Sequence, residues 1–373
     1  MKKYHGNKYV KHYSCWNHLL TMIWAQLTGR KSLRDIEFSL RAHSDKTYRL
    51  GIGKTVSRST IAEANASREI AIFREMSEKM MRNVAKISIV RADLNEIFSG
   101  LSMAGLFAVD SSTVHLPLSK FPWSVPQRNG GGIKIHTMLD LLRNIPVTCM
   151  ITGNEERDQT FMDDYNYAPG CLYLFDKAYV KTSSLYGIHR IKAFFVVRKK
   201  ENMCFQIISS DTDASLRNPS VLSDSTICFT SRIARRGYPE PLRLICYYNK
   251  DKDEILSFMT NNFDMPAILV ADAYRNRWII EVFFKWVKQH LHIETFYGFS
   301  ANAVSIQIYT AVITYCMVAK LADQFKLRCS NYELLRALGV SLTEKIYLDE
   351  WIKSFQARDI SPGIEIWGKS LFD

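Results

Sequence analysis

Paired cysteines are missing from this sequence, which excludes two common kinds of small scaffold. The eight cysteines are scattered singly, and no two have the C-x2-C spacing of a structural zinc site. A disulfide framework is not expected either, because 373 residues, 47% of them hydrophobic, suffice for a sizeable core. We therefore expect reduced thiols and a cytoplasmic protein.

The sequence also lacks the marks of secreted, membrane and nucleotide-binding proteins. The basic N-terminal stretch MKKYHGNKYVKHYSCW has no continuous apolar segment, so we expect no secretory leader. Gln307 and Lys320 interrupt the most apolar stretch, residues 303–322, which we interpret as a buried core helix and not as a membrane span. The glycines at 130–132 lack the lysine of a phosphate-binding loop, and we interpret them as a flexible loop.

Positive charge is what the sequence has in excess. Lys and Arg number 49 against 37 Asp and Glu, which gives a formal net charge of +12. A protein this basic is expected to bind a polyanion, and nucleic acid is the leading candidate. The alternative that charge alone leaves open is a basic protein without a nucleic-acid partner.

Three regions with different patterns divide the chain. Residues 1–95 have helical periodicity with Arg and Lys near the turns, which suits a helical DNA-binding domain, although a bundle with a basic solvated face has the same pattern. Residues 96–300 alternate apolar strands with helices, which predicts an α/β fold with a mixed sheet. Further strands at about 200–262 indicate an inserted β subdomain or an extension of that sheet. Residues 301–373 form a C-terminal helical region.

Capping residues indicate where the first helices begin. Ser32 is expected to open a helix, and Ser59 or Thr60 to open a long continuous helix over residues 61–84.

Two aspartates follow strongly apolar runs that read as buried strands. Asp110 ends the apolar part of GLFAVDSSTVHL, and Asp176 follows CLYLF. A lone aspartate at a strand end is usually a turn residue, but two of them on neighbouring strands could converge at one edge of a sheet.

The segment YRNRWIIEVFFKWVK, residues 274–288, places charges inside a very apolar stretch. On one helix from about 267 to 291, its polar side chains fall within an arc of about 80°. They are Tyr274, Arg277, Glu281, Lys285 and Lys288. A salt-bridge ladder around Glu281 would explain this stripe. A third carboxylate beside the two aspartates would also explain it, because such oxygen ligands suit two Mg²⁺ or Mn²⁺ ions in phosphoryl transfer, with the nearby cations holding phosphates.

Four of these residues have the spacing Y-x2-R-x3-E-x6-K: Tyr274, Arg277, Glu281 and Lys288. This spacing resembles the signature of the insertion-sequence-four (IS four) family of DDE transposases. AVDSST around Asp110 and FDKAYV around Asp176 are similar to the first two acidic motifs of that family. Trp278, directly after the arginine, and the N-terminal VSRSTIAEANASR fit the same resemblance.

The resemblance implies a ribonuclease-H-like core with a β-rich insertion. It implies that Asp110, Asp176 and Glu281 are catalytic and hold Mg²⁺ or Mn²⁺, with two ions expected. The expected DNA-contacting residues are Tyr274, Arg277, Trp278, Lys285 and Lys288. It further implies a homodimer in a paired-end complex with DNA, associated with the nucleoid and not with a membrane.

The expected function is cut-and-paste transposition, in which the enzyme binds terminal inverted repeats, cleaves at the transposon ends and joins them to target DNA. The alternatives are a structure-specific nuclease or resolvase on the same core, and a catalytically inactive DNA-binding derivative. Some family members stack a tryptophan of the insertion on a flipped base during hairpin formation, but this chain has no Trp between 124 and 277. Tyr247, Tyr248 and Phe229 are possible substitutes.

Overall fold

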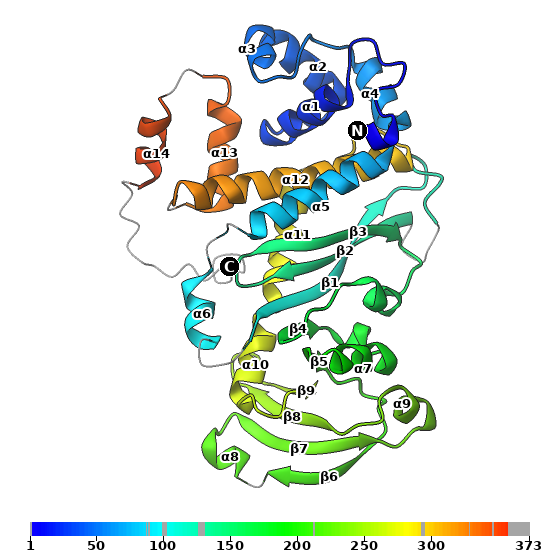
Figure 1. Ribbon diagram of the computed structural model, residues 1–373, viewed down its shortest axis with the longest axis vertical. Helices are drawn as coiled ribbons and strands as arrows, with labels where there is room; N and C mark the ends of the chain where they lie inside the picture. The colour runs from blue at the N-terminus through cyan, green and yellow to red at the C-terminus, as the bar shows by residue number, and fades with distance from the viewer. Residues whose placement is uncertain are drawn as a thin grey trace.

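A nine-stranded mixed sheet runs through most of the molecule, and helices gather at one of its ends (Figure 1). The computed structural model describes residues 2–356 except 87, 89, 99–102, 126–130, 212, 292–294, 328, 345 and 346. The strand order is β3-β2-β1-β4-β5-β9-β8-β7-β6. The predicted α/β class with a mixed sheet is confirmed.

Five strands form the half of the sheet nearest the helices. They are β1 (Gly105–Leu116), β2 (Gly131–Asp140), β3 (Ile145–Gly153), β4 (Cys171–Phe175) and β5 (Phe194–Arg198). The first three pair antiparallel, whereas β4 pairs parallel with β1 and with β5. All five residues of β4 are buried, as expected for a parallel strand with both faces covered. Gly131 and Gly132 lie in β2, so the loop interpretation was wrong for them, and Gly130 lies outside the described residues.

Four further strands continue the same sheet. They are β6 (Phe205–Asp211), β7 (Val221–Phe229), β8 (Leu242–Asn249) and β9 (Glu254–Thr260). Neighbours among these four strands pair antiparallel. The strand β9 also pairs antiparallel with β5, with Val196 opposite Thr260 and Arg198 opposite Phe258, and so joins the four strands to the other five. The strands expected at about 200–262 therefore extend the sheet and do not form a separate one.

The N-terminal part of the chain is helical. Its helices are α1 (Cys15–Leu27), α2 (Leu33–Ala42), α3 (Ser44–Arg49), α4 (Arg58–Ser67), α5 (Ile70–Ala85) and α6 (Ala92–Phe98), preceded by a short 3₁₀ helix, η1 (Lys2–Tyr4). The Ser32 hydroxyl caps α2 as predicted, by accepting a hydrogen bond from the Asp35 backbone N–H.

The continuous helix predicted over residues 61–84 is wrong. Arg68 has an extended backbone with φ −74° and ψ 144°, which separates α4 from α5, and Ser57 caps α4 in place of Ser59 or Thr60. The break is stabilised by Asn302, whose side-chain amide donates hydrogen bonds to the backbone carbonyls of Asn65 and Arg68. A partner so distant in sequence leaves no mark in the local pattern.

The remaining helices lie between strands or follow the sheet. They are η2 (Asp158–Asp164), η3 (Lys177–Tyr179), α7 (Thr182–Arg190), α8 (Ala214–Arg217), α9 (Arg232–Gly237), α10 (Ala267–Arg275), α11 (Trp278–His290), α12 (Ala301–Gln324), α13 (Asn331–Ser341) and α14 (Leu348–Gln356). In the described part of the chain, α12 is the one helix long and apolar enough to cross a membrane, but 78% of its most apolar window is buried. It packs against α1, α4, α5 and α13, so it is a core helix, as the sequence predicts.

Candidate active site

Asp110 and Asp176 lie side by side on neighbouring strands. In the parallel pairing of β1 with β4, Val109 is opposite Phe175, and the residue that follows each of them is an aspartate. Asp176 directly follows β4, as predicted, but the prediction that Asp110 ends its strand is wrong. The strand β1 continues to Leu116 because its polar second half pairs with β2 as far as Gly131.

Glu281 comes from the first turn of α11, which packs against β1. The single helix predicted from about 267 to 291 is wrong, because a tight turn at Asn276 and Arg277 separates α10 from α11. In this turn the backbone N–H groups of Arg277, Ile279 and Ile280 each bond to the carbonyl three residues earlier. Tyr274 and Glu281 therefore lie on different helices, and the predicted arc does not hold for Tyr274.

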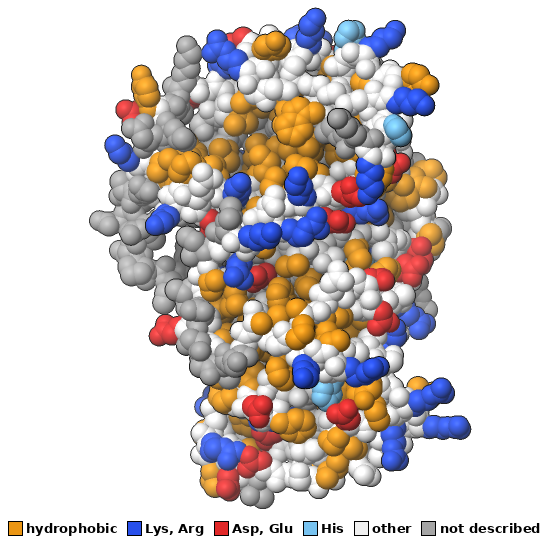
Figure 2. All heavy atoms as spheres, viewed as in Figure 1, with side chains coloured by type: hydrophobic (Ala, Val, Ile, Leu, Met, Phe, Trp, Pro, Cys, Tyr) orange, Lys and Arg blue, Asp and Glu red, His pale blue; other side chains and the backbone are white. Residues whose placement is uncertain are grey.

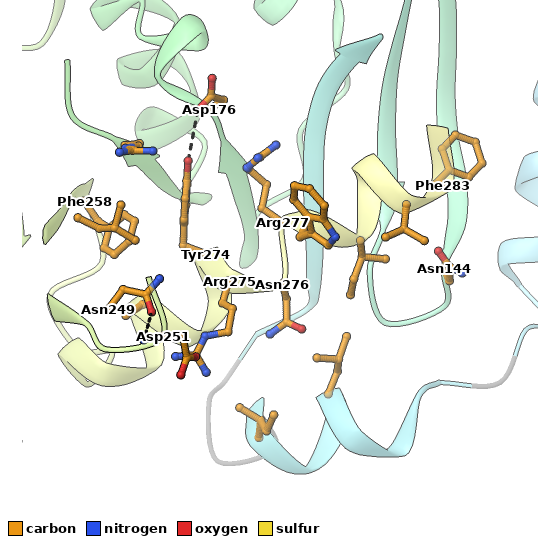
Figure 3. Close-up of a pocket in the computed structure, with 18 of the residues that line it drawn as sticks. Asn144, Asp176, Asn249, Asp251, Phe258, Tyr274, Arg275, Asn276, Arg277 and Phe283 are labelled. Atoms are coloured by element: carbon orange, nitrogen blue, oxygen red, sulfur yellow. Dashed lines mark hydrogen bonds between the residues drawn. The ribbon is translucent and has the colours of Figure 1, made fainter. Parts of the chain in front are cut away.

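Arg277 joins two of the three acids. Its Nη1 donates to Asp110 Oδ2 at 2.9 Å, and its Nη2 forms an ion pair with Glu281 Oε1. The Arg277 side chain is only 13% exposed. The Tyr274 hydroxyl donates to Asp176 Oδ1 at 3.4 Å, and Figure 3 shows Tyr274 pointing to Asp176 with Arg277 alongside. The structure thus gathers the three predicted acids around Arg277 and Tyr274.

The two lysines on α11 have different surroundings. Lys288 Nζ donates to the Thr113 carbonyl oxygen at 2.6 Å, which ties α11 to β1. Lys285 is exposed. The sequence allowed a salt-bridge ladder around Glu281, and the structure contains one such ion pair, between Glu281 and Arg277.

Burial dominates the electrostatics of Asp110. It raises the pKa of this carboxyl to about 6, against the opposing effect of the positive charge on Arg277. The negative charges of Glu281 and Asp176 raise the pKa further. Such an environment favours any arrangement that brings a cation to these carboxylates.

The three acids are the right donors for a hard divalent cation, since all offer carboxylate oxygens. Their present arrangement does not surround one point. Among the described residues, no group of three His, Cys, Asp or Glu side chains is placed to hold a metal ion. The guanidinium of Arg277, bound to both Asp110 and Glu281, accounts for this.

The acid cluster lies between a groove and a cavity. A groove of about 470 Å³ is lined by Asp110 and Glu281 together with polar side chains that sequence reasoning did not single out. These are Ser111 and Ser112, which lie within AVDSST, and Gln289, which no motif marks. A cavity of about 1100 Å³ is lined by Asp176 and Arg277 (Figure 3). Trp278 also lines it, and its side chain is 47% exposed.

The aromatic residues suggested as base-stacking substitutes have limited access. Phe229 is buried in the core, and the Tyr248 hydroxyl donates to Asp253 across the β8–β9 turn. Tyr247 lines the cavity but is itself buried, and its hydroxyl accepts a hydrogen bond from Arg275. Trp278 is the more exposed aromatic side chain at this cavity.

Comparisons with known proteins find transposases. Residues 102–317 match the family described as Transposase DDE domain, and residues 1–53 match a domain of unknown function. A protein of Sinorhizobium fredii named as transposase y4zB is 30% identical over 69% of this chain and 69% of its own. A protein of Geobacillus stearothermophilus named as a transposase for insertion sequence element IS5377 is 30% identical over 72% of this chain and 70% of its own. A protein of Synechocystis named as a transposase for insertion sequence element IS4SA is 21% identical over 82% of this chain and 84% of its own.

Proposed function

We propose a reaction for this site from one premise: the chain belongs to the DDE transposase family and is a DNA transposase. Within that family we assign it to the IS four branch. The Y-x2-R-x3-E-x6-K spacing supports this assignment, as does its similarity to the protein named for IS4SA.

We further propose that β1–β5 and the helices packed on them form a ribonuclease-H-like core within residues 96–300. The three antiparallel strands followed by two parallel ones support this assignment. Residues 1–95 would be the helical DNA-binding domain, and 301–373 the C-terminal helical region. Exposed bases on α5 support a DNA-binding role: Arg74, Lys79 and Arg82. Figure 2 shows Lys and Arg side chains gathered across the molecule at the level of α5.

Asp110, Asp176 and Glu281 are the proposed catalytic carboxylates and ligands of Mg²⁺ or Mn²⁺. Two such ions would activate the attacking oxygen and stabilise the leaving oxygen of an in-line phosphoryl transfer. The observation that supports the assignment best is the β1–β4 register, because it brings two aspartates 66 positions apart in sequence to adjacent positions, 110 and 176.

The other residues of the site would hold the DNA strand. Lys285 and Gln289 line the groove beside Asp110 and Glu281, where a positive charge and an amide can bind backbone phosphates. Trp278 offers an exposed aromatic face on which a base can stack. Attack of water on the phosphodiester at the transposon end releases a 3′-hydroxyl, and that hydroxyl then attacks a phosphodiester of the target DNA. The proposed assembly is a homodimer that holds two ends, in the cytoplasm and associated with the nucleoid.

The test is cleavage of a duplex carrying the element's own ends by a Glu281→Gln variant in Mg²⁺. We expect cleavage and joining to fall by about 10³-fold or more, as for other members of a catalytic unit, while binding of the duplex in a gel shift persists. Glu240→Gln, at an exposed position away from the site, is the matched control and should cleave normally. Full cleavage by Glu281→Gln would exclude Glu281 from the reaction.

A further inference from the structure

One guanidinium neutralises two of the proposed metal ligands. Arg277 Nη1 lies 2.9 Å from Asp110 Oδ2, and Nη2 is bound to Glu281 Oε1. The side chain is largely buried, in a setting where two carboxylates need a compensating cation. Arg277 supplies that charge from within the chain.

We propose that Arg277 is an exchangeable counter-ion: a DNA phosphate draws it away from Asp110 and Glu281, and the two carboxylates then become available to divalent ions. The inference rests on the proposed assignment of the three acids. It makes the free protein a poor binder of divalent ions and couples metal binding to DNA binding. By thermodynamic linkage, each ligand then tightens the binding of the other.

The position of Arg277 in the chain suits such a movement. It lies in the turn between α10 and α11, where the backbone is hydrogen-bonded on both sides, so the movement is one of the side chain alone. Within the described residues its Nε is buried without a hydrogen-bond partner, so the side chain is not fully satisfied in its present place.

The cavity of about 1100 Å³ provides room for the displaced side chain. Arg277 forms part of its wall (Figure 3), which Trp278 and Arg275 also line. Asp110 and Glu281 line the groove, together with Lys285 and Lys288, whereas Asp176 lines the cavity. A DNA backbone that follows these positive charges would bring a phosphate to the site.

Exchange of a carboxylate for a phosphate keeps the character of the interaction. Arg277 now makes one N–H···O bond to each of two carboxylates, and a single phosphate can accept both bonds, so the arginine keeps two charge-assisted hydrogen bonds on moving. The two carboxylates left behind then need a new cation. Without DNA, a divalent ion has to compete with Arg277, and its apparent affinity is reduced by the small fraction of molecules in which the arginine has moved.

The test measures Mn²⁺ binding to the full chain by isothermal titration calorimetry, with and without a duplex carrying the element's ends. For the natural protein we expect the duplex to tighten Mn²⁺ binding about tenfold. Arg277→Gln should bind Mn²⁺ about tenfold more tightly than the natural protein without DNA, and the duplex should add little. Arg275→Gln, which changes the neighbouring and exposed arginine, should behave as the natural protein does.

Two further variants make the outcome decisive. Asp110→Asn should weaken Mn²⁺ binding, and if it does not, the assignment of the acids fails and the proposed function with it. If Asp110→Asn weakens binding while Arg277→Gln leaves it unchanged or weaker, the counter-ion inference alone is wrong. Should Arg277→Gln fail to fold, Arg277→Lys serves instead, because an ammonium keeps the charge but loses the fork, and it should tighten Mn²⁺ binding to a smaller degree. Unchanged binding in Arg277→Lys would then overturn the inference.

Discussion

The two ends of the nine-stranded sheet are stabilised in different ways. At one end, β3 is covered by α5 and α12, whose apolar side chains join the main hydrophobic core. At the other end, β6 is uncovered, and every one of its residues after Phe205 is exposed. A buried ion pair between Arg243 of β8 and Asp224 of β7 lies near this uncovered end. The first end is therefore covered by packed helices, whereas the second combines an exposed edge strand with a buried ion pair beside it.

The proposed catalytic carboxylates belong to the covered half of the sheet. Asp110 lies on β1, and α11, which carries Glu281, packs against that strand. Rigid packing around a site holds its functional groups within the small tolerance that catalysis requires. The comparison indicates that substitutions in the uncovered half affect stability and surface contacts more than they affect the positions of the acids.

The largest effect is expected from Arg243→Met near the uncovered end. Arg243 pairs with Asp224 at 2.5 Å and also donates to the backbone carbonyl of Asn262, so its loss leaves a buried carboxylate unpaired. We expect a decrease of about 3–5 kcal/mol in the free energy of unfolding, measured with urea.

Arg217→Met is the matched control for this variant. Arg217 pairs with Asp211 at the same end of the sheet, but both side chains are substantially exposed. Its loss should lower the free energy of unfolding by less than about 1 kcal/mol. Equal effects of the two substitutions would show that the buried pair does not stabilise this end.

An intermediate effect on the free energy of unfolding is expected when the pH is lowered, because of buried histidines in the helical half of the molecule. Burial lowers the pKa of His18 to about 3, with the hydrogen bond to Asn65 opposing, and burial also lowers the pKa of His136 in β2. An unfolded histidine binds its proton near pH 6.5, so the folded state is favoured above that pH, and this contribution is lost as the pH falls. For His18 alone the loss is about 1.4 kcal/mol per pH unit, or about 2 kcal/mol by pH 5.

The measurement compares unfolding at pH 7 and pH 5 for the natural protein and for His18→Gln. The variant should lose less stability between these two pH values. His12→Gln, at an exposed position, is the control. An identical pH dependence in His18→Gln and the natural protein would contradict the assignment.

The smallest effect is expected from removing one methylene group of an isoleucine in β6. Ile207 is 59% exposed, so Ile207→Val should change the free energy of unfolding by less than about 0.5 kcal/mol. The same change at the fully buried Ile308 of α12 should destabilise the protein by about 0.5–1.5 kcal/mol. A larger effect at Ile207 would mean that another surface covers β6 in solution.

Local patterns in the sequence predicted the strands better than the joints between elements. The apolar run CLYLF predicted β4 and the place of Asp176. The segment 105–116 predicted β1 with its bounds. The apolar part of that segment suggested a strand end at Asp110, but the pairing of residues 111–113 with β2 puts Asp110 inside the strand. The turn at Asn276 contains neither Gly nor Pro, so nothing in its composition indicates a break.

The assembly of the site was predicted only in part. The spacing within residues 274–288 identified Arg277 and Glu281, which the structure brings together with Asp110. The hydrogen bond from Arg277 to Asp110 spans 167 positions, and no periodicity encodes a contact of that range. Lys288 was expected at a phosphate, whereas its bond to the Thr113 carbonyl depends on how α11 packs against β1.

The pairing of β5 with β9 has a consequence for how this protein could have changed during evolution. The chain leaves the central strands after Arg198 and returns to them at Phe258, which is paired with Arg198. The two ends of the intervening segment therefore lie next to each other. A segment of another length or architecture, with ends that meet in the same way, would leave Asp110, Asp176 and Glu281 where they are. Such an exchange would have to preserve the packing of Phe258 against Tyr274 and the hydrogen bond from Arg275 to Tyr247.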